Sequence, residues 1–307
     1  MPYKRKFLQP IQFKKAAIKY SDGFLELSLA KGYGPIKVRW NDSLPIPKFA
    51  TICWKKGVGW QLNCVIEKNV ETIDLDPDKV MGVDLGVKRI AATFDGGNCV
   101  TYSGKLIRSL IRLRNKMNAE TQMKLSRLKK GGRKSQRIKY AHRKVVRRID
   151  NKIKDILHKT SRTMVNEAIQ GKVSTLVFGD CSDIHNQTNL GHVNNQQVQQ
   201  SPEQKLRNYV QYKFESVGGI VATVPEHYTT QTCPRCGHRH KPQTRMYHCP
   251  ICDFIYDRDG VGAVNLRSRV SSDFKLDVVG GLTLSRGWKY QPPLPCFIAK
   301  QGESQLL

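Results

Sequence analysis

Alternating apolar and polar positions dominate the first part of the chain and predict antiparallel strands. Residues 16–30 and 50–67 each contain two such segments around a turn, at Ser21-Asp22-Gly23 in the first and at 55–59 in the second. A period of two buries one face of a strand and leaves the other in water, and Asp-Gly is a hairpin turn signal. Residues 1–78 are therefore expected to form a β-rich module, part of a small β-barrel.

The next part of the chain changes from a strand pattern to a helical one. Short apolar segments at 80–84, 89–95 and 99–102, separated by turn residues, predict a three-stranded meander. Apolar residues at helical spacing then run through 105–170, with a break at Gly131-Gly132. This region is expected to be a helical hairpin.

Beyond the hairpin, strands and helices alternate. The apolar segments 172–178 and 220–224 predict two buried strands. The Asn- and Gln-rich stretch 181–200 is expected to be a loop, and a helix with Ser201 as N-cap of a capping box is expected to reach Val217. The whole pattern predicts an α/β fold.

The net charge of the chain indicates an anionic partner. The 307 residues include 52 Lys and Arg against 25 Asp and Glu, a net charge of +27. Such an excess favours a polyanion, most simply nucleic acid bound through its phosphates. The sequence has neither an apolar run of membrane-spanning length nor a secretory signal pattern. We expect a cytoplasmic, nucleoid-associated protein with no membrane partner, and the sequence leaves its oligomeric state open.

The second helix of the hairpin carries the densest positive charge. Residues 133–148 contain eight Lys or Arg and no acid. A solvated helix face usually mixes both signs, so a run of one sign favours contact with nucleic acid over solvent exposure alone. Trp54, Trp60 and Tyr20 in the β-module fit either base stacking or a core position. The predicted nucleic-acid-binding residues are Arg133, Lys134, Arg137, Lys139, Arg143, Lys144, Arg147 and Arg148.

Acidic residues recur at the ends of the predicted elements. Asp84, Asp180 and Glu226 each follow an apolar strand, and Asp259 opens the last helix. Sites in open α/β sheets form at the carboxyl ends of strands. Acids gathered there repel one another unless cations neutralise them, and oxygen ligands suit Mg²⁺ or Mn²⁺. Two such ions can activate water and stabilise a leaving oxygen in phosphodiester hydrolysis. Any one of these acids alone fits a turn or cap equally well.

Four of the nine cysteines form two Cys-x-x-Cys pairs, Cys233 with Cys236 and Cys249 with Cys252. Two thiolate pairs on tight knuckles predict a tetrahedral Cys₄ zinc site, which is structural because no coordination position stays open. Free thiols, or a histidine ligand, are the alternatives. The nearby histidines are His238, His240 and His248, and the other five cysteines (Cys53, Cys64, Cys99, Cys181 and Cys296) are expected to be core or incidental thiols.

Three motifs in this order resemble those of the TnpB family, transposon-encoded RNA-guided DNA endonucleases related to type V CRISPR effectors. They are Gly-Val-Asp-Leu-Gly at 82–86, Tyr-Thr-Thr-Gln-Thr-Cys at 228–233, and Asp-Arg-Asp-Gly-Val-Gly-Ala-Val-Asn at 257–265. The resemblance implies an RNase H-like (RuvC) nuclease domain at 79–232 and 253–268. It also implies an inserted zinc ribbon at 233–252, a partial β wedge module before the nuclease domain, and a C-terminal tail at 269–307.

The same resemblance implies a guide RNA, a DNA substrate, and catalysis by Asp84, Asp259 and a middle acid. The family's Glu position after the fourth strand is occupied by Gly179 here. Glu226, at the end of the neighbouring strand, is the predicted replacement, with Asp180 as an auxiliary acid or as the alternative third ligand. A catalytically impaired relative that binds RNA or DNA is the rival reading, favoured by Gly179 and by a start inside the wedge module without the family's recognition lobe. A strand-transferring transposase is a third.

Overall fold

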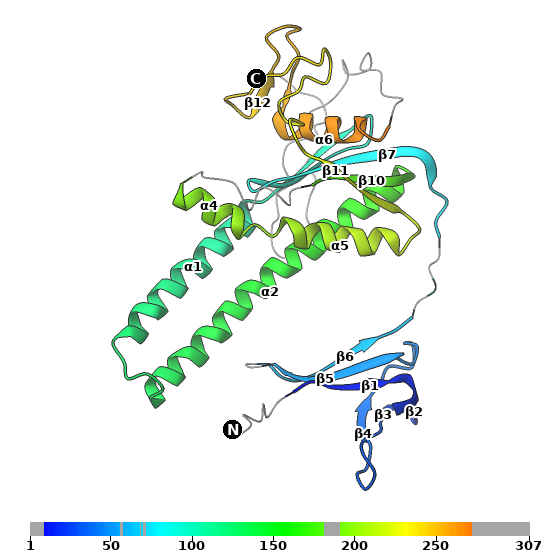
Figure 1. Cartoon of the computed structure of the whole chain (residues 1–307), viewed down its shortest axis with the longest axis vertical. Helices are drawn as coiled ribbons and strands as arrows, with labels where there is room; N and C mark the ends of the chain where they lie inside the picture. Colours follow the sequence, from blue (N-terminus) through cyan, green and yellow to red (C-terminus); the bar gives the residue numbers. More distant parts are fainter. Residues whose placement is uncertain (1–8, 56–57, 68, 70–71, 181–190, 272–307) are drawn as a thin grey trace, which may run out of the picture. The chain divides into compact units, whose positions relative to one another are not determined.

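The computed structural model describes residues 9–55, 58–67, 69, 72–180 and 191–271 (Figure 1). The chain divides into two compact units, the smaller comprising Met1–Val70 with Lys139–Lys144 and the larger Glu71–Ile138 with Val145–Leu307. Most of the predicted tail, from residue 272, lies outside the described residues, as do Cys181 and Cys296. No helix among the described residues is long and apolar enough to span a bilayer.

The smaller unit consists of two three-stranded antiparallel sheets, ordered β1-β5-β6 and β2-β3-β4. Both predicted hairpins are confirmed: Asp22 and Gly23 adopt positive φ angles of 52° and 79° between β2 and β3, and Trp54 pairs with Trp60 across β5 and β6. The pattern did not predict β1 or β4. The strands are β1 (Ile11–Lys14), β2 (Ile18–Ser21), β3 (Phe24–Leu27), β4 (Ile36–Arg39), β5 (Phe49–Lys55) and β6 (Gly59–Val65), with a 3₁₀ turn at Lys15–Ala17.

The larger unit is built on one five-stranded sheet, ordered β11-β10-β7-β8-β9. The predicted meander is confirmed, since β7, β8 and β9 pair antiparallel in sequence. β10 then joins the other side of β7 in parallel, and β11 joins β10 in parallel. The strands are β7 (Asp76–Leu85), β8 (Arg89–Phe94), β9 (Cys99–Ser103), β10 (Val173–Asp180) and β11 (Ile220–Pro225).

Helices complete the larger unit (Figure 1). The predicted hairpin is confirmed as α1 and α2, and the helix expected to end near Val217 is α5. The loop predicted at 181–200 is wrong in its second half, where α4 lies; a tertiary contact accounts for this, because side chains of α1 bond to those of α4 and outweigh a weak helix propensity. The bounds are α1 (Lys105–Ser126), α2 (Arg133–Gln170), α4 (His192–Gln199), α5 (Glu203–Glu215) and α6 (Arg258–Ser268).

The predicted capping box of α5 is also wrong. Pro202 is the N-cap and makes no side-chain cap bond. The Ser201 hydroxyl instead donates to the Glu203 carboxylate, over 2.8 Å. The Ser201 hydroxyl therefore bonds to the Glu203 side chain and not to the helix backbone, as the sequence pattern had predicted.

Two hydrophobic clusters cover the two faces of the large sheet. On one face, Met81, Val83 and Leu85 of β7 pack with apolar residues of α1, α2 and α5. On the other, Ala92 and Phe94 of β8 pack with α6 and with the segment that carries the cysteine pairs. Because strand residues alternate between faces, the remaining β7 side chains near its end point towards α6. That geometry decides where Asp84 lies.

Candidate active site and metal centre

Asp84 lies at the end of β7, under α6. The helix approaches so closely that a Cβ added to Gly82 would lie 2.0 Å from the Ala263 carbonyl oxygen. A Cβ added to Gly262 of α6 would lie 2.6 Å from Oδ2 of Asp84. Glycine at these two positions therefore lets the helix backbone cover the carboxylate, which is 6% exposed.

The start of α6 differs by two residues from the prediction. Asp257, not Asp259, is the N-cap: its Oδ1 accepts from the backbone N–H groups of Asp259 at 3.0 Å and Gly260 at 3.2 Å. Asp259 occupies the first helical turn, and its Oδ2 lies 2.7 Å from Nη1 of Arg245 and 3.6 Å from Nη1 of Arg89. Because Asp257 caps the helix, the Asp259 carboxylate is left to face these two arginines.

Glu226 follows β11 and lies over Gly179 of the neighbouring strand β10. A Cβ on Gly179 would lie 3.0 Å from Cγ and 3.1 Å from Oε2 of Glu226. The space that a side chain at 179 would occupy is thus filled by the glutamate of the adjacent strand. Strand alternation accounts for the position of Asp180, which is exposed and is paired in register with Pro225.

Asp84, Glu226 and Asp259 all line one cavity of about 430 Å³. Asp180 is not among its lining residues, so the structure brings together three of the four predicted acids. Lys88, Arg89, Arg245 and Arg258 also line the cavity, together with Thr230. A site lined by acids and cations side by side has the composition needed to hold both a metal ion and an anionic phosphate.

The electrostatics of Asp84 fit a cation ligand. Burial raises the pKa of Asp84 well above its usual value, and the nearby Glu226, Asp259 and Glu203 carboxylates raise it further, while Arg258 opposes the change. Its buried Oδ1 has no hydrogen-bond partner. A buried carboxyl oxygen without a donor costs stability, and a bound divalent cation would remove that cost. Among the described residues, the four paired cysteines are the only group of three or more His, Cys, Asp or Glu side chains gathered closely enough to hold a metal ion, so the three carboxylates do not form such a closed group.

Residues at the end of α6 hold the backbone on both sides of Glu226. The Arg269 guanidinium donates to the Pro225 carbonyl and, over 2.6 Å, to the His227 carbonyl. Asn265 donates to the carbonyls of Thr229 at 2.6 Å and Thr232 at 2.8 Å. One helix thus carries Asp259 at its start and a clamp on the Glu226 segment at its end. The sequence analysis missed Arg269, and only the bond geometry reveals it.

Removing this clamp is expected to loosen Glu226 without unfolding the protein. We expect Arg269→Gln to raise the Mg²⁺ concentration needed for half-maximal cleavage by about tenfold, because two bonds to a segment that carries a metal ligand are lost. Nucleic-acid binding in EDTA should change less than twofold. The matched control is Arg235→Gln, a basic residue of the cysteine-bearing segment. Equal metal dependence in both variants would contradict the clamp.

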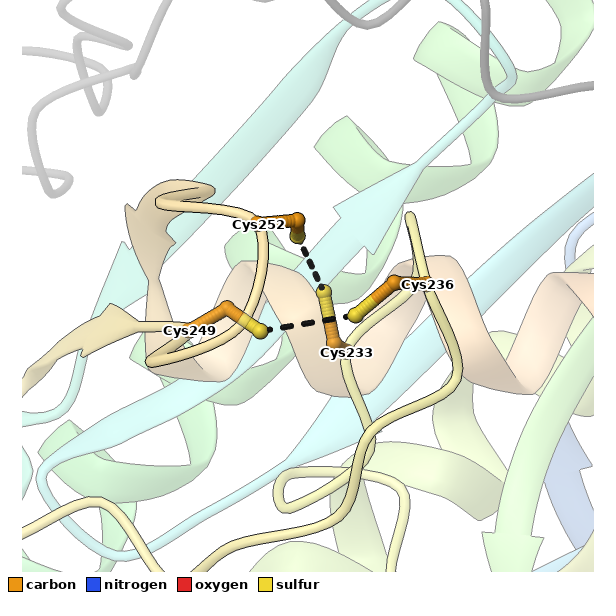
Figure 2. A group of neighbouring side chains, drawn as sticks. All are labelled: Cys233, Cys236, Cys249 and Cys252. Atoms are coloured by element: carbon orange, nitrogen blue, oxygen red, sulfur yellow. Dashed lines mark hydrogen bonds between the residues drawn. The ribbon is translucent and has the colours of Figure 1, made fainter.

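The four paired cysteines form a closed cluster (Figure 2). Sγ of Cys233 lies 3.6 Å from Sγ of Cys252, and Sγ of Cys236 lies 3.5 Å from Sγ of Cys249. Sulfurs about 2.3 Å from one tetrahedral ion lie at nearly these separations. The cluster can therefore hold a metal ion. The histidines considered as ligands, His238, His240 and His248, are not part of it.

The two cysteine knuckles have the same backbone design. In each, the N–H four residues after the first cysteine donates to that cysteine's carbonyl, from Gly237 to Cys233 at 2.9 Å and from Asp253 to Cys249 at 3.1 Å. Gly237 and Asp253 both adopt positive φ angles, 74° and 52°. The strand β12 (Met246–His248) precedes the second cysteine pair and pairs antiparallel with β13 (Ile255–Asp257), which leads directly into α6.

The predicted nucleic-acid-binding residues all lie on the first half of α2. The aromatic side chains of the β-module are not in its core: Trp54 and Trp60 are 42% and 60% exposed, with ring centroids 5.3 Å apart. Tyr20 is also exposed and its hydroxyl bonds to Asp42. The core reading of these three residues is therefore wrong, because the small unit buries other residues, Phe13, Leu25 and Leu27 among them.

Comparison with known proteins gives two family models that match separate parts of the chain. Residues 63–185 match the model OrfB_IS605, described as a probable transposase, and residues 204–266 match the Cas12f1-like TNB domain. Between them they cover more than half of the chain. The fold and site define a mixed α/β protein with a cysteine cluster and an acidic cavity, and two of its parts are similar to a transposase model and to a Cas12f1-like model.

Individual relatives are similar to longer parts of the chain. The chain is 28% identical over 196 residues to a TnpB-like protein of Methanocaldococcus jannaschii, covering 62% of this chain and 68% of the relative. It is 26% identical over 265 residues to a Streptomyces pristinaespiralis protein named "Putative RNA-guided DNA endonuclease", covering 83% and 61%. A cryo-EM structure of a CRISPR-Cas12f ternary complex aligns with a TM-score of 0.49 at 15% identity, covering 85% and 59%. The chain is therefore similar to TnpB-like proteins over most of its length.

Proposed function

We propose that the chain is a metal-dependent endodeoxyribonuclease guided by RNA. One observation carries the proposal: Asp84, Glu226 and Asp259, far apart in sequence, line a single cavity beside four cationic side chains. The strand order supports an RNase H-like (RuvC) domain, with a meander of three strands followed by two parallel ones on the far side of β7. The two relatives described above are named as TnpB-like and as an RNA-guided DNA endonuclease.

In this proposal the three carboxylates hold Mg²⁺ or Mn²⁺. Such ions supply an activated water and neutralise the charge that develops on the leaving oxygen of a phosphodiester. Asp84 provides a buried carboxylate from β7 and Glu226 a second from beyond β11. Asp259 would exchange its ion pair with Arg245 for the cation. Arg245, released from that pair, and Arg258, which also lines the cavity, would then orient the scissile phosphate.

The cysteine cluster is proposed to hold a structural Zn²⁺. A closed set of four thiolates leaves no position for substrate. The ion would fix the position of the segment between Glu226 and α6. Cys233 follows Glu226 by seven residues, and the segment after Cys252 leads through β13 into α6. The basic face of α2 is proposed to contact the phosphates of RNA or DNA.

Loss of this zinc is expected to abolish cleavage. Cys249→Ser, or prolonged treatment with a strong zinc chelator, should lower the melting temperature and reduce Mg²⁺-dependent cleavage at least about 100-fold, because metal binding and ribbon folding are coupled. The measurement is zinc content by atomic spectroscopy beside cleavage rate. Cys53→Ser, in the β-module, is the control. A fully active protein without zinc would contradict the structural role.

The direct test of the proposed function starts from the RNA that copurifies with the full chain. That RNA is sequenced, and plasmids matching its guide segment are incubated with the complex and Mg²⁺. We expect cuts only in matching plasmids. Specific RNA binding with no cleavage in Mg²⁺ or Mn²⁺ would support a second function, binding without catalysis. The Arg245–Asp259 ion pair favours that second function, because it occupies a predicted metal ligand.

A further inference from the structure

A second cavity, of about 290 Å³, adjoins the candidate active site. It lies between α1, α4 and the start of α5. It shares Val87 and Gln197 with the carboxylate cavity, so the two cavities adjoin. Nothing in the proposed cleavage chemistry uses this second space.

The walls of this base-sized cavity are aliphatic and its edges are amides. The aliphatic residues are Val87, Ile90, Ile107, Ile111 and Pro202. The amides are Asn115, Gln196, Gln197 and Gln200. Apolar faces with a few fixed polar groups are typical of small-ligand sites, and amides present both donors and acceptors. This combination suits a flat apolar ring with a hydrogen-bonding edge.

The amides are held in place by bonds between helices. The Asn115 side chain donates from Nδ2 to Oε1 of Gln200 over 2.7 Å. Nη2 of Arg108 donates to Oε1 of Gln197 over 2.9 Å. These bonds use the nitrogen of Asn115 and the oxygen of Gln200. The polar edge of a bound ring can therefore donate a hydrogen bond to the Asn115 oxygen and accept one from the Gln200 nitrogen. One donor and one acceptor side by side suit the edge of a nucleobase.

Positive charge follows the cavity along α1. Arg108, Arg112 and Lys116 all line it and recur every fourth residue, which places them on one helix face about 6 Å apart along the axis. Among the described residues that line the cavity, none is acidic. The ligand that fits has a neutral ring and an anionic backbone.

We propose that this cavity receives one nucleobase of the DNA strand whose phosphate lies at the carboxylates. The inference rests on the proposed function for its substrate. The base enters between the aliphatic walls, the amides meet its edge, and the α1 cations contact the adjoining phosphates. Enzymes that hold an unstacked base use apolar walls and edge hydrogen bonds in this way. Cleavage should consequently depend on the presence of a base at one position near the cut.

The test compares two tryptophan variants of α1 in the full chain. Ile111→Trp fills the cavity; Leu113→Trp is the matched control, because Leu113 is 46% exposed and does not line the cavity. Binding of single-stranded DNA is measured by fluorescence anisotropy in the zinc-loaded protein without added Mg²⁺ or Mn²⁺, with an abasic site moved through each position in turn. For the unaltered protein we expect one position at which the abasic site weakens binding about tenfold. Ile111→Trp should remove that dependence and Leu113→Trp should keep it.

A second variant covers the case in which Ile111→Trp fails to fold. Asn115→Leu keeps the branched shape of the side chain but removes its amide, and we expect it to reduce the abasic penalty while far-UV circular dichroism stays unchanged. Equal binding of intact and abasic DNA at every position would overturn the proposal. A penalty found only with abasic RNA would overturn the assignment to DNA. Since binding is measured without Mg²⁺ or Mn²⁺, an inactive nuclease leaves this result interpretable.

Discussion

Asp84→Asn is expected to abolish Mg²⁺-dependent cleavage and, in the same protein, to raise the thermal stability of the zinc-loaded form without Mg²⁺. Loss of a catalytic metal ligand typically costs about 10³-fold or more in rate. Asparagine keeps the shape of the side chain but removes a buried charge that faces Glu226 and Asp259. Relief of about 1 kcal/mol would raise the melting temperature by about 2–4 °C.

The pH dependence of this stability has a defined sign. Because the folded-state pKa of Asp84 is raised, first by burial and then by neighbouring acids, the protonated form favours folding. Its contribution is present below the unfolded-state pKa and is lost as pH rises through the folded-state pKa. The melting temperature of the protein without Mg²⁺ should therefore fall as the pH rises through that range, and the melting temperature of Asp84→Asn should fall less. Addition of Mg²⁺ should stabilise the unaltered protein more than the variant. A zinc-loaded variant that is less stable than the zinc-loaded parent at neutral pH without Mg²⁺ would contradict the assigned repulsion.

Glu226→Gln is expected to reduce cleavage by about 10³-fold, whereas Asp180→Asn should change it less than twofold. Glu226 lines the carboxylate cavity and Asp180 does not. The amide keeps the hydrogen-bonding shape but binds a divalent cation poorly. Rates are compared at saturating Mg²⁺ with equal amounts of the RNA complex. The opposite ranking of the two variants would assign the middle ligand to Asp180.

The contact between Glu226 and Gly179 permits a sharper experiment. Gly179→Glu alone should be inactive and destabilised, because its side chain would begin 3.0 Å from Cγ of Glu226. In the double variant Gly179→Glu with Glu226→Ala, the carboxylate enters the same space from the other strand. We expect the cleavage rate of the double variant to be at least about tenfold higher than that of Glu226→Ala, a coupling typical of directly contacting residues. Activity no higher in the double variant than in Glu226→Ala would show that the two positions are not interchangeable.

The sequence predicted those elements whose pattern is local. The hairpin around Asp22-Gly23, the meander 80–102 and the long amphipathic α2 follow from periodicity and turn residues alone. The α4 helix could not be predicted, because its Asn- and Gln-rich segment has little helical signal of its own and is held by bonds from α1. The capping box failed because Ser201 has a competing local acceptor in Glu203.

The candidate site also contains some residues that the sequence indicates and others that only the tertiary structure reveals. Strand-end position and the family resemblance pointed to Asp84, Glu226 and Asp259, and the cysteine spacing pointed to the closed thiolate cluster. The N-cap role of Asp257, the Arg245–Asp259 pair and the Arg269 clamp depend on how α6 crosses the sheet. No sequence spacing encodes that crossing; it follows from the small side-chain volume at Gly82 and Gly262.

The central claim is that three distant carboxylates bind divalent cations together, and Mn²⁺ binding tests it most directly. Free Mn²⁺ is titrated by electron paramagnetic resonance in the zinc-loaded protein without nucleic acid. We expect specific binding in the parent protein and in Asp180→Asn. Binding should weaken at least about tenfold in Asp84→Asn, Glu226→Gln and Asp259→Asn. Identical Mn²⁺ binding in the parent and in these three variants would contradict the account.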